Sequence, residues 1–140
     1  MEPTPLAAGA SYEFAHRVVA ADSAARLPLE PDDAFPDVLA TSRMLALMEI
    51  AAARLMQPVL AAGTLSVGVG VELRHAAPTV PDEIVHVKAS FVGMRGALYE
   101  FEIQVRDRAG LAGAGRHTRA AVSADGFRQQ AMERFGAALQ

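Results

Sequence analysis

The 140-residue chain contains no cysteine, no tryptophan and no asparagine. Without cysteine it can form no disulfide, no thiolate nucleophile and no cysteine-ligated zinc site. Without asparagine, every mechanism that depends on an Asn amide is closed to it. The 4 histidines are scattered and show no spacing typical of metal ligands, so we expect neither a metal nor another cofactor.

The charge and the hydropathy of the chain argue against a disordered, a nucleic-acid-binding and a membrane-spanning protein. Hydrophobic residues make up 51% of the chain and charged residues 21%, a globular balance without the signature of disorder. A net charge of −3 gives no general affinity for nucleic acid or for an anionic membrane. No apolar run approaches the roughly 18 residues that span a bilayer, and the first residues lack the basic and apolar regions of a signal peptide. We expect a cytoplasmic protein with no nucleic-acid or membrane partner.

Hydrophobic periodicity predicts one long helix and several strands. A period of two predicts strands over 64–76, 83–92 and 97–107. Residues 11–19 alternate loosely and end in β-branched residues, and 110–123 are glycine-rich; we predict a strand over each of them as well. Residues 40–60 are apolar almost all round and predict a buried helix, with Thr41 or Ser42 as its N-cap. Residues 20–37 hold three prolines and predict a surface loop, and 127–139 predict a short amphipathic helix.

The order of these elements predicts the fold. A helix this apolar must be covered nearly all round, and a curved antiparallel sheet wrapped around it is the simplest cover. We therefore predict an α+β fold with one long central helix inside a curved antiparallel sheet, followed by a short C-terminal helix. The sequence shows no internal repeat and no linker, so we expect a single domain over residues 1–140.

Glu49 is a carboxylate inside the apolar helix. At about 100° per residue it falls between Leu45 and Met56, far from the narrow polar face around Arg43. A glutamate on a helix usually lies at the rim of the apolar stripe with its tip in water. A carboxylate on the buried face instead needs polar partners, which makes Glu49 a candidate catalytic base or nucleophile.

His75 is a second polar residue at an apolar position. It follows Val67, Val69, Val71 and Leu73 at every second position, so a regular strand would place all five side chains on one face. A histidine packed in a strand and bonded to the backbone is the common outcome, and three other histidines compete with it. Together with Thr41 at the start of the helix, Glu49 and His75 form a possible set of hydroxyl, base and orienting group.

Three stretches of the chain resemble a known family. They are "DAFPDVLATSRMLALMEIAAARLMQPVL" (33–60), "GVGVELRHAAPTVP" (68–81) and "GAGRHTRAAV" (113–122). Over roughly residues 10–130 the chain resembles the fluoroacetyl-CoA thioesterase branch of the hotdog-fold acyl-CoA thioesterases. The resemblance implies that Thr41, Glu49 and His75 form the catalytic set. It also implies that the backbone at Gly68 lines the acyl and thioester end of the pocket.

The resemblance also implies binding residues and an assembly. Arg119 matches an arginine next to the active site, and Phe35 matches an aromatic gate over the acyl group. Three residues before Phe35, where the fluoroacetyl enzyme has an aromatic residue, this chain has Asp32. Selectivity for fluoroacetyl therefore does not follow from the resemblance. Hotdog relatives generally pair their sheets edge to edge, so we expect a C2 homodimer.

The expected reaction is hydrolysis of a small acyl-CoA thioester. Glu49 would act as base or nucleophile, with His75 and Thr41 assisting. The arginines nearest the strand ends are candidate contacts for the CoA phosphates, namely Arg74, Arg95, Arg116 and Arg119. Thr41 and Glu49 lie about 12 Å apart along a straight helix and cannot touch there. Either Thr41 precedes the helix in a loop that folds back, or the site joins two subunits.

Three other functions compete with this one. A hotdog hydratase or dehydratase of enoyl thioesters uses an Asp and a His on the central helix, and residues 40–60 contain neither. A non-catalytic acyl-CoA-binding hotdog protein is the main alternative, although all three catalytic positions are filled. A purely structural dimeric module would leave Glu49 unexplained.

Overall fold

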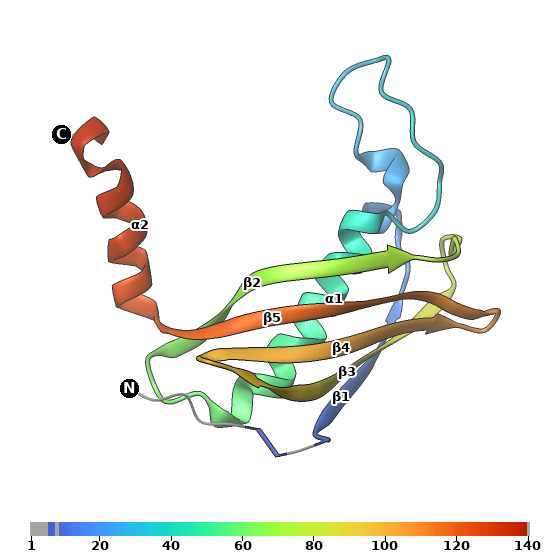
Figure 1. Cartoon of the computed structure of the whole chain (residues 1–140). Coiled ribbons are helices and arrows are strands. Elements are labelled where there is room, and N and C mark those ends of the chain that lie inside the picture. Colours follow the sequence, from blue (N-terminus) through green and yellow to red (C-terminus); the bar gives the residue numbers. More distant parts are fainter. Residues whose placement is uncertain (1–5, 8, 140) are drawn as a thin grey trace.

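The structure, a computed structural model that describes residues 6, 7 and 9–139, is one antiparallel sheet curved around a long helix (Figure 1). Its strands are β1 (Ser11–Arg17), β2 (Thr64–His75), β3 (Ile84–Arg95), β4 (Leu98–Asp107) and β5 (Gly110–Ser123). The helices are α1 (Thr41–Met56) and α2 (Ala124–Leu139), with short 3-10 turns η1 (Ala20–Asp22), η2 (Ala24–Arg26) and η3 (Gln57–Val59). The predicted α+β architecture is confirmed. Residues 1–5, 8 and 140, which the predicted 1–140 domain includes, lie outside the described residues.

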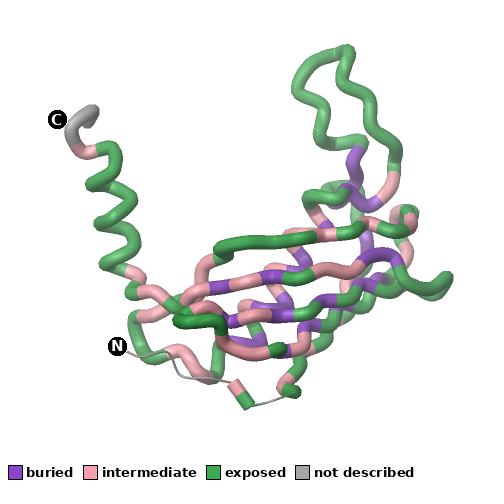
Figure 2. Tube along the Cα trace, in the orientation of Figure 1, coloured by how far each residue is buried: buried purple, intermediate pink, exposed green. Residues whose placement is uncertain are grey.

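The sheet has the strand order β1-β3-β4-β5-β2, with every neighbouring pair antiparallel. Alternate residues of its central strands face α1 and are buried, as along β4 at Tyr99, Phe101, Ile103 and Val105. Figure 2 shows buried residues alternating with exposed and half-buried ones along the central strands, and further buried residues on α1. Within the described part of the chain, no helix is long and apolar enough to cross a membrane.

The side of α1 that points away from the sheet is only half covered within one chain. Met44, Leu47 and Met48 are buried against the sheet, whereas Leu45 and Ile50 remain half-buried. The expectation that the helix is covered nearly all round is therefore not met by a single protomer. Half-buried apolar residues on one side of a helix leave surface for a further packing partner.

The edge strand β2 contains a β-bulge. Its register with β5 shifts between Gly68 and Gly70, so Val69 is an extra residue. An extra residue reverses the alternation of side chains. The face toward α1 therefore holds Ser66 and Gly68 before the bulge and Val71, Leu73 and His75 after it. The prediction that Val67 and Val69 share the face of His75 is wrong, because a uniform period of two cannot show a bulge.

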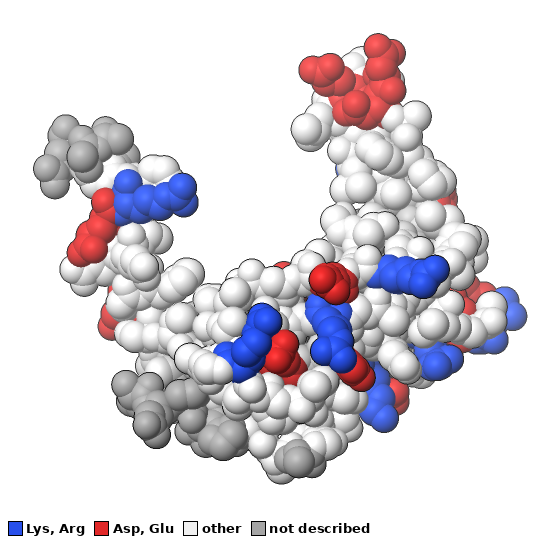
Figure 3. Space-filling view, viewed as in Figure 1, with Lys and Arg blue, Asp and Glu red and all other residues white. Residues whose placement is uncertain are grey.

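The loop between β1 and α1 is held together at its neck. Ser23 and Leu39 form an isolated antiparallel bridge, and the Ala40 amide donates to the Asp22 carbonyl over 2.9 Å. The Ser23 hydroxyl donates to the Asp37 carboxylate over 2.7 Å. Beyond this neck, residues 27–36 are exposed and extend away from the sheet, with an acidic tip (Figure 3).

Asp22 ties this neck to β1 and α1. It is 1% exposed, and its carboxylate accepts from the Val19 amide at 2.9 Å and from Arg43 Nε at 2.9 Å, while His16 Nε2 lies 2.7 Å away. Burial by itself would raise the pKa of the Asp22 carboxyl. The hydrogen bonds from Val19, His16 and Arg43 outweigh burial and hold the pKa below its usual value.

Candidate active site

Thr41 and His75 form a hydrogen-bonded pair where the start of α1 meets the end of β2. Thr41 Oγ1 lies 2.8 Å from His75 Nδ1. Ala40 is the N-cap of α1, and no side chain caps it, so the predicted N-cap at Thr41 or Ser42 is wrong and the Thr41 hydroxyl is directed to the histidine. The Nε2 atom of His75 is buried and has no hydrogen-bond partner among the described residues.

A cavity of about 520 Å³ lies beside this pair and is lined by Phe35, Thr41 and His75. Apart from Ser42, the other lining residues are apolar and come from the loop before α1 and from the segment after β2, among them Leu27, Leu39, Ala76, Ala77 and Pro78. Phe35 is 49% exposed. A mostly apolar cavity with a few polar groups suits a small acyl group better than a charged ligand.

Glu49 belongs to a second cluster, formed with β2 and β5. Its Oε2 accepts from Arg119 Nη1 at 2.8 Å, and its side chain is 40% exposed. A Cβ atom at Gly68 would lie only 2.6 Å from Glu49 Oε2. The missing side chain at Gly68 therefore leaves room for the carboxylate. Glu49 lies at the rim of the helix in this chain, with a guanidinium partner, and not on the fully buried face.

Arg119 is surrounded by protein acceptors. Its Nε donates to Ser66 Oγ at 2.9 Å and its Nη2 to the Ser66 carbonyl at 3.0 Å. Its Nη1 lies near both Glu49 and His117. The side chain is 7% exposed. Arg119 therefore lies beside Glu49, where the resemblance placed it, but its N–H groups point at the protein and not at a CoA phosphate.

His117 is a member of this cluster that the sequence reasoning did not assign. It is 4% exposed, its Nδ1 lies 2.7 Å from the Gly70 carbonyl and its Nε2 lies 3.0 Å from Arg119 Nη1. Burial is the main cause that lowers the pKa of His117; the hydrogen bond with the Gly70 carbonyl opposes it, the charge of Arg119 adds to the lowering, and the charge of Glu49 opposes it least. The available signal was its position two residues before Arg119, which places both on one face of β5.

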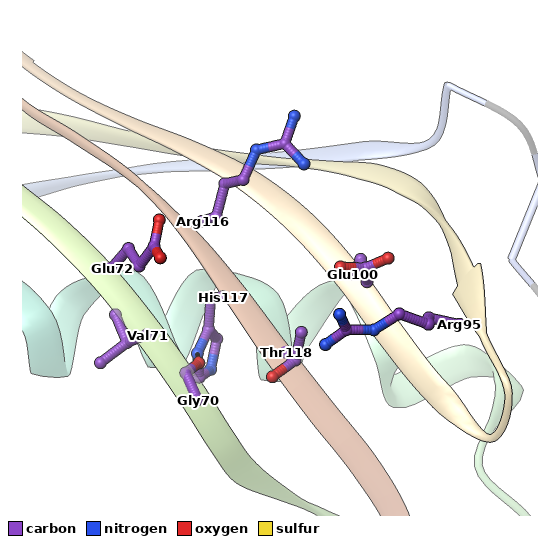
Figure 4. Close-up of a pocket in the computed structure, with 8 residues that line it drawn as sticks. All are labelled: Gly70, Val71, Glu72, Arg95, Glu100, Arg116, His117 and Thr118. Atoms are coloured by element: carbon purple, nitrogen blue, oxygen red, sulfur yellow. Dashed lines mark hydrogen bonds between the residues drawn. The ribbon is translucent and has the colours of Figure 1, made fainter.

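The other arginines considered for CoA lie among carboxylates. Arg116 Nη2 donates to Glu102 Oε1 over 2.8 Å. Arg95 and Arg116 line a surface depression of about 440 Å³ together with Glu72 and Glu100 (Figure 4). Arg74 lines a neighbouring depression that also contains carboxylates. This face of the sheet therefore offers little excess positive charge to a phosphate.

The two clusters do not meet within one chain. Thr41 is the first residue of α1 and Glu49 lies eight residues further along the same helix, about 12 Å away along its axis. The alternative in which Thr41 precedes the helix in a loop that folds back is therefore wrong. Among the described residues, no group of three or more His, Asp or Glu side chains is placed to hold a metal ion.

Comparison with known proteins gives the family. Residues 19–125 match the family described as fluoroacetyl-CoA-specific thioesterase. The chain is 35% identical over 101 residues to the fluoroacetyl-CoA thioesterase of Streptantibioticus cattleyicolor, across 71% of this chain and 73% of that one.

Solved structures agree with this match. A fluoroacetyl-CoA thioesterase is similar with a TM-score of 0.87 and 28% identity over 93% of this chain and 98% of that chain. A variant of such an enzyme in complex with fluoroacetate and CoA gives a TM-score of 0.83 and 28% identity over 87% and 99%. A hot-dog-like protein from Thermanaerovibrio acidaminovorans shares the fold, with a TM-score of 0.83 and 23% identity over 93% of each chain. The chain belongs to the fluoroacetyl-CoA-specific thioesterase family of hotdog-fold thioester hydrolases.

Proposed function

We propose that the protein hydrolyses the thioester of a small acyl-CoA, with Glu49 as base or nucleophile and with His75 and Thr41 assisting. The observation that carries this proposal is the Thr41–His75 pair, which lies on an apolar cavity in a chain of a thioesterase family. The cavity would take the acyl group, and Phe35 would contact it there. The reaction needs no cofactor beyond the CoA of the substrate itself.

The chemistry assigns one task to each group. As a base, the Glu49 carboxylate takes a proton from water while the water oxygen bonds to the thioester carbonyl carbon. As a nucleophile, it bonds to that carbon itself and forms an anhydride that water then cleaves. In both routes the C–S bond breaks and the CoA thiolate takes up a proton. His75 Nε2, which has no other partner in the described chain, is suited to handle that proton.

A homodimer would bring the two clusters together. The edge strand β2 has 12 residues, and three apolar side chains on it are 41–55% exposed, namely Leu65, Val69 and Val71. A long apolar edge strand is an open template for pairing with another strand. Antiparallel pairing of two β2 strands about a twofold axis runs the His75 end of one strand toward Gly68 of the other. That operation moves Thr41 and His75 toward Glu49 of the partner subunit.

The acyl group is small in this proposal, but fluoroacetyl is not singled out. The curated relative is named for fluoroacetyl-CoA, and this chain has Asp32 on the exposed loop that also carries Phe35. A carboxylate there does not supply the apolar contact of an aromatic ring. We place the reaction in the cytoplasm, where acyl-CoA substrates would reach it.

Release of free thiol from a panel of acyl-CoAs tests the proposal. The panel contains acetyl, fluoroacetyl, butyryl, phenylacetyl and long-chain thioesters. Glu49→Gln and His75→Ala should each lower kcat/KM at least about a hundredfold. Glu13→Gln and His86→Ala change the same residue types at exposed positions and should leave it unchanged. Saturable binding of acyl-CoA without turnover by the wild type would contradict the proposal and favour the non-catalytic binding protein.

A further inference from the structure

We propose that His117 is a positioning residue, whose imidazole holds the guanidinium of Arg119 against the carboxylate of Glu49. The inference rests on the proposed function for the role of Glu49, but its geometry stands by itself. His117 and Arg119 lie two residues apart on β5, and both side chains point to the α1 face of the sheet. His117 is 4% exposed, so water does not compete for its ring nitrogens.

The neighbours of His117 define its tautomer. The Gly70 carbonyl lies 2.7 Å from Nδ1 and can only accept, so Nδ1 carries the proton. Arg119 can only donate, so Nε2, 3.0 Å from Nη1, presents its lone pair. The imidazole is thus neutral and joins the backbone of β2 to the guanidinium. A protonated ring would place an N–H against another N–H and a positive charge beside a positive charge.

Arg119 is held from three sides as a result. Ser66 accepts from Nε and Nη2, and His117 accepts from Nη1. The remaining contact of Nη1 is Glu49 Oε2 at 2.8 Å. Without His117, the Nη1 end of the guanidinium would keep only Glu49 as an acceptor among the described residues. Glu49 is a flexible side chain that is 40% exposed. His117 therefore determines where Arg119 holds the carboxylate.

Two variants separate this role from simple filling of space. His117→Phe keeps a ring of similar size and removes both polar contacts, whereas His117→Gln keeps a donor and an acceptor. We expect kcat to fall about tenfold in His117→Phe with KM changed less than about twofold, and His117→Gln to recover most of the loss. The exposed His86→Phe serves as the matched control.

NMR of the Arg119 guanidinium provides a readout that needs no substrate. In the wild type its N–H signals should be separate and slow to exchange, in His117→Phe averaged and fast, and in His117→Gln restored. Unchanged Arg119 signals in a folded His117→Phe protein would overturn the inference. Loosened Arg119 signals together with an inactive wild type would refute the proposed function and support the positioning role.

The wild-type protein alone gives a second test, which holds even if His117→Phe fails to fold. Nitrogen-edited spectra of the imidazole should show His117 neutral, with the proton on Nδ1 and none on Nε2. A ring protonated on Nε2, or charged at neutral pH, would contradict the hydrogen bonds on which the inference depends.

Discussion

Replacing Gly68 by alanine tests whether the position of the Glu49 carboxylate determines turnover. The new Cβ would lie 2.6 Å from Glu49 Oε2, closer than any ordinary contact. The oxygen has to retreat by about 0.8 Å to reach the 3.4 Å at which ordinary contact begins. The new Cβ would lie 3.5 Å from Arg119 Nη1, so the oxygen retreats roughly at right angles to its 2.8 Å hydrogen bond with Arg119. The bond is kept, but the carboxylate no longer occupies its present position.

The expected effects on stability and on activity differ in size. The Glu49 carboxylate is the end of a flexible side chain that is 40% exposed, and an ion pair of this kind contributes at most about 1 kcal/mol. The free energy of unfolding should therefore fall by less than about 1 kcal/mol. Displacing a reacting group by about 1 Å can cost a hundredfold in rate. We expect kcat/KM to fall about a hundredfold.

Gly70→Ala is the matched control. Its Cβ would meet Thr118 Oγ1 at 3.2 Å, on the other face of the sheet because of the bulge. Both variants are compared by thermal unfolding and by thiol release. The reasoning is refuted if Gly68→Ala keeps wild-type kcat/KM, or if Gly70→Ala loses as much activity as Gly68→Ala while both remain folded.

Four further outcomes are expected. Glu49→Gln and His75→Ala chains, each inactive alone, should regain about one quarter of wild-type thiol release when they are coexpressed. About half of the dimers are then mixed, and each mixed dimer has one of its two shared sites intact. No recovery would place each site within one subunit. Asp22→Asn should lower the free energy of unfolding by about 2 kcal/mol, because it removes the charge from the hydrogen bonds with Arg43 and His16. Folding depresses the pKa of the Asp22 carboxyl below its usual 3.8, so Asp22 stabilises the fold above that pH. This stabilisation is lost as the pH falls through the folded pKa. Urea denaturation at several pH values should therefore show that Asp22→Asn loses less stability in acid than the wild type. The pKa of His117 is also lowered on folding, so the wild type should lose stability as the pH falls below about 6.5, and an equal loss in His117→Gln would contradict this. In Gly115→Ala the new Cβ would overlap a backbone carbonyl of β2, which cannot retreat as a side chain does. Thermal unfolding should show that the free energy of unfolding falls by about 2 kcal/mol. An unchanged melting temperature would refute the overlap.

The sequence predicted the elements of the fold well and their ends less well. Alternation along β4 is strict because one face packs on α1 and the other meets solvent, so its range was nearly right. The helix predicted to Leu60 ends at Met56, and the turn that follows contains Pro58. The bulge at Val69 was missed because bulges depend on the partner strand, which a single strand's pattern does not contain.

The candidate site was only partly predictable from the sequence, because a sequence pattern reports local positions and not contacts between distant residues. Glu49 and His75 stand out as polar residues at apolar positions, and that signal is local. The hydrogen bond between Thr41 and His75 joins residues 34 apart, and the one between Glu49 and Arg119 joins residues 70 apart. No periodicity reports such contacts. His117 went unassigned because its role depends on the Gly70 carbonyl across the strand pair.

The closed neck of the loop before α1 has a consequence for how this protein can change. The Ser23–Leu39 bridge and the bond from Ala40 to the Asp22 carbonyl fix both ends of the loop on one short platform. Residues 27–36 beyond it can therefore gain, lose or exchange side chains without moving the first turn of α1, whereas Asp37 belongs to the neck through its bond with Ser23. If Phe35 contacts the acyl group as proposed, acyl preference can then be altered by evolution or by loop grafting without changing Thr41, Glu49 or His75. The tip of the loop can therefore vary in sequence and length while its two ends stay fixed.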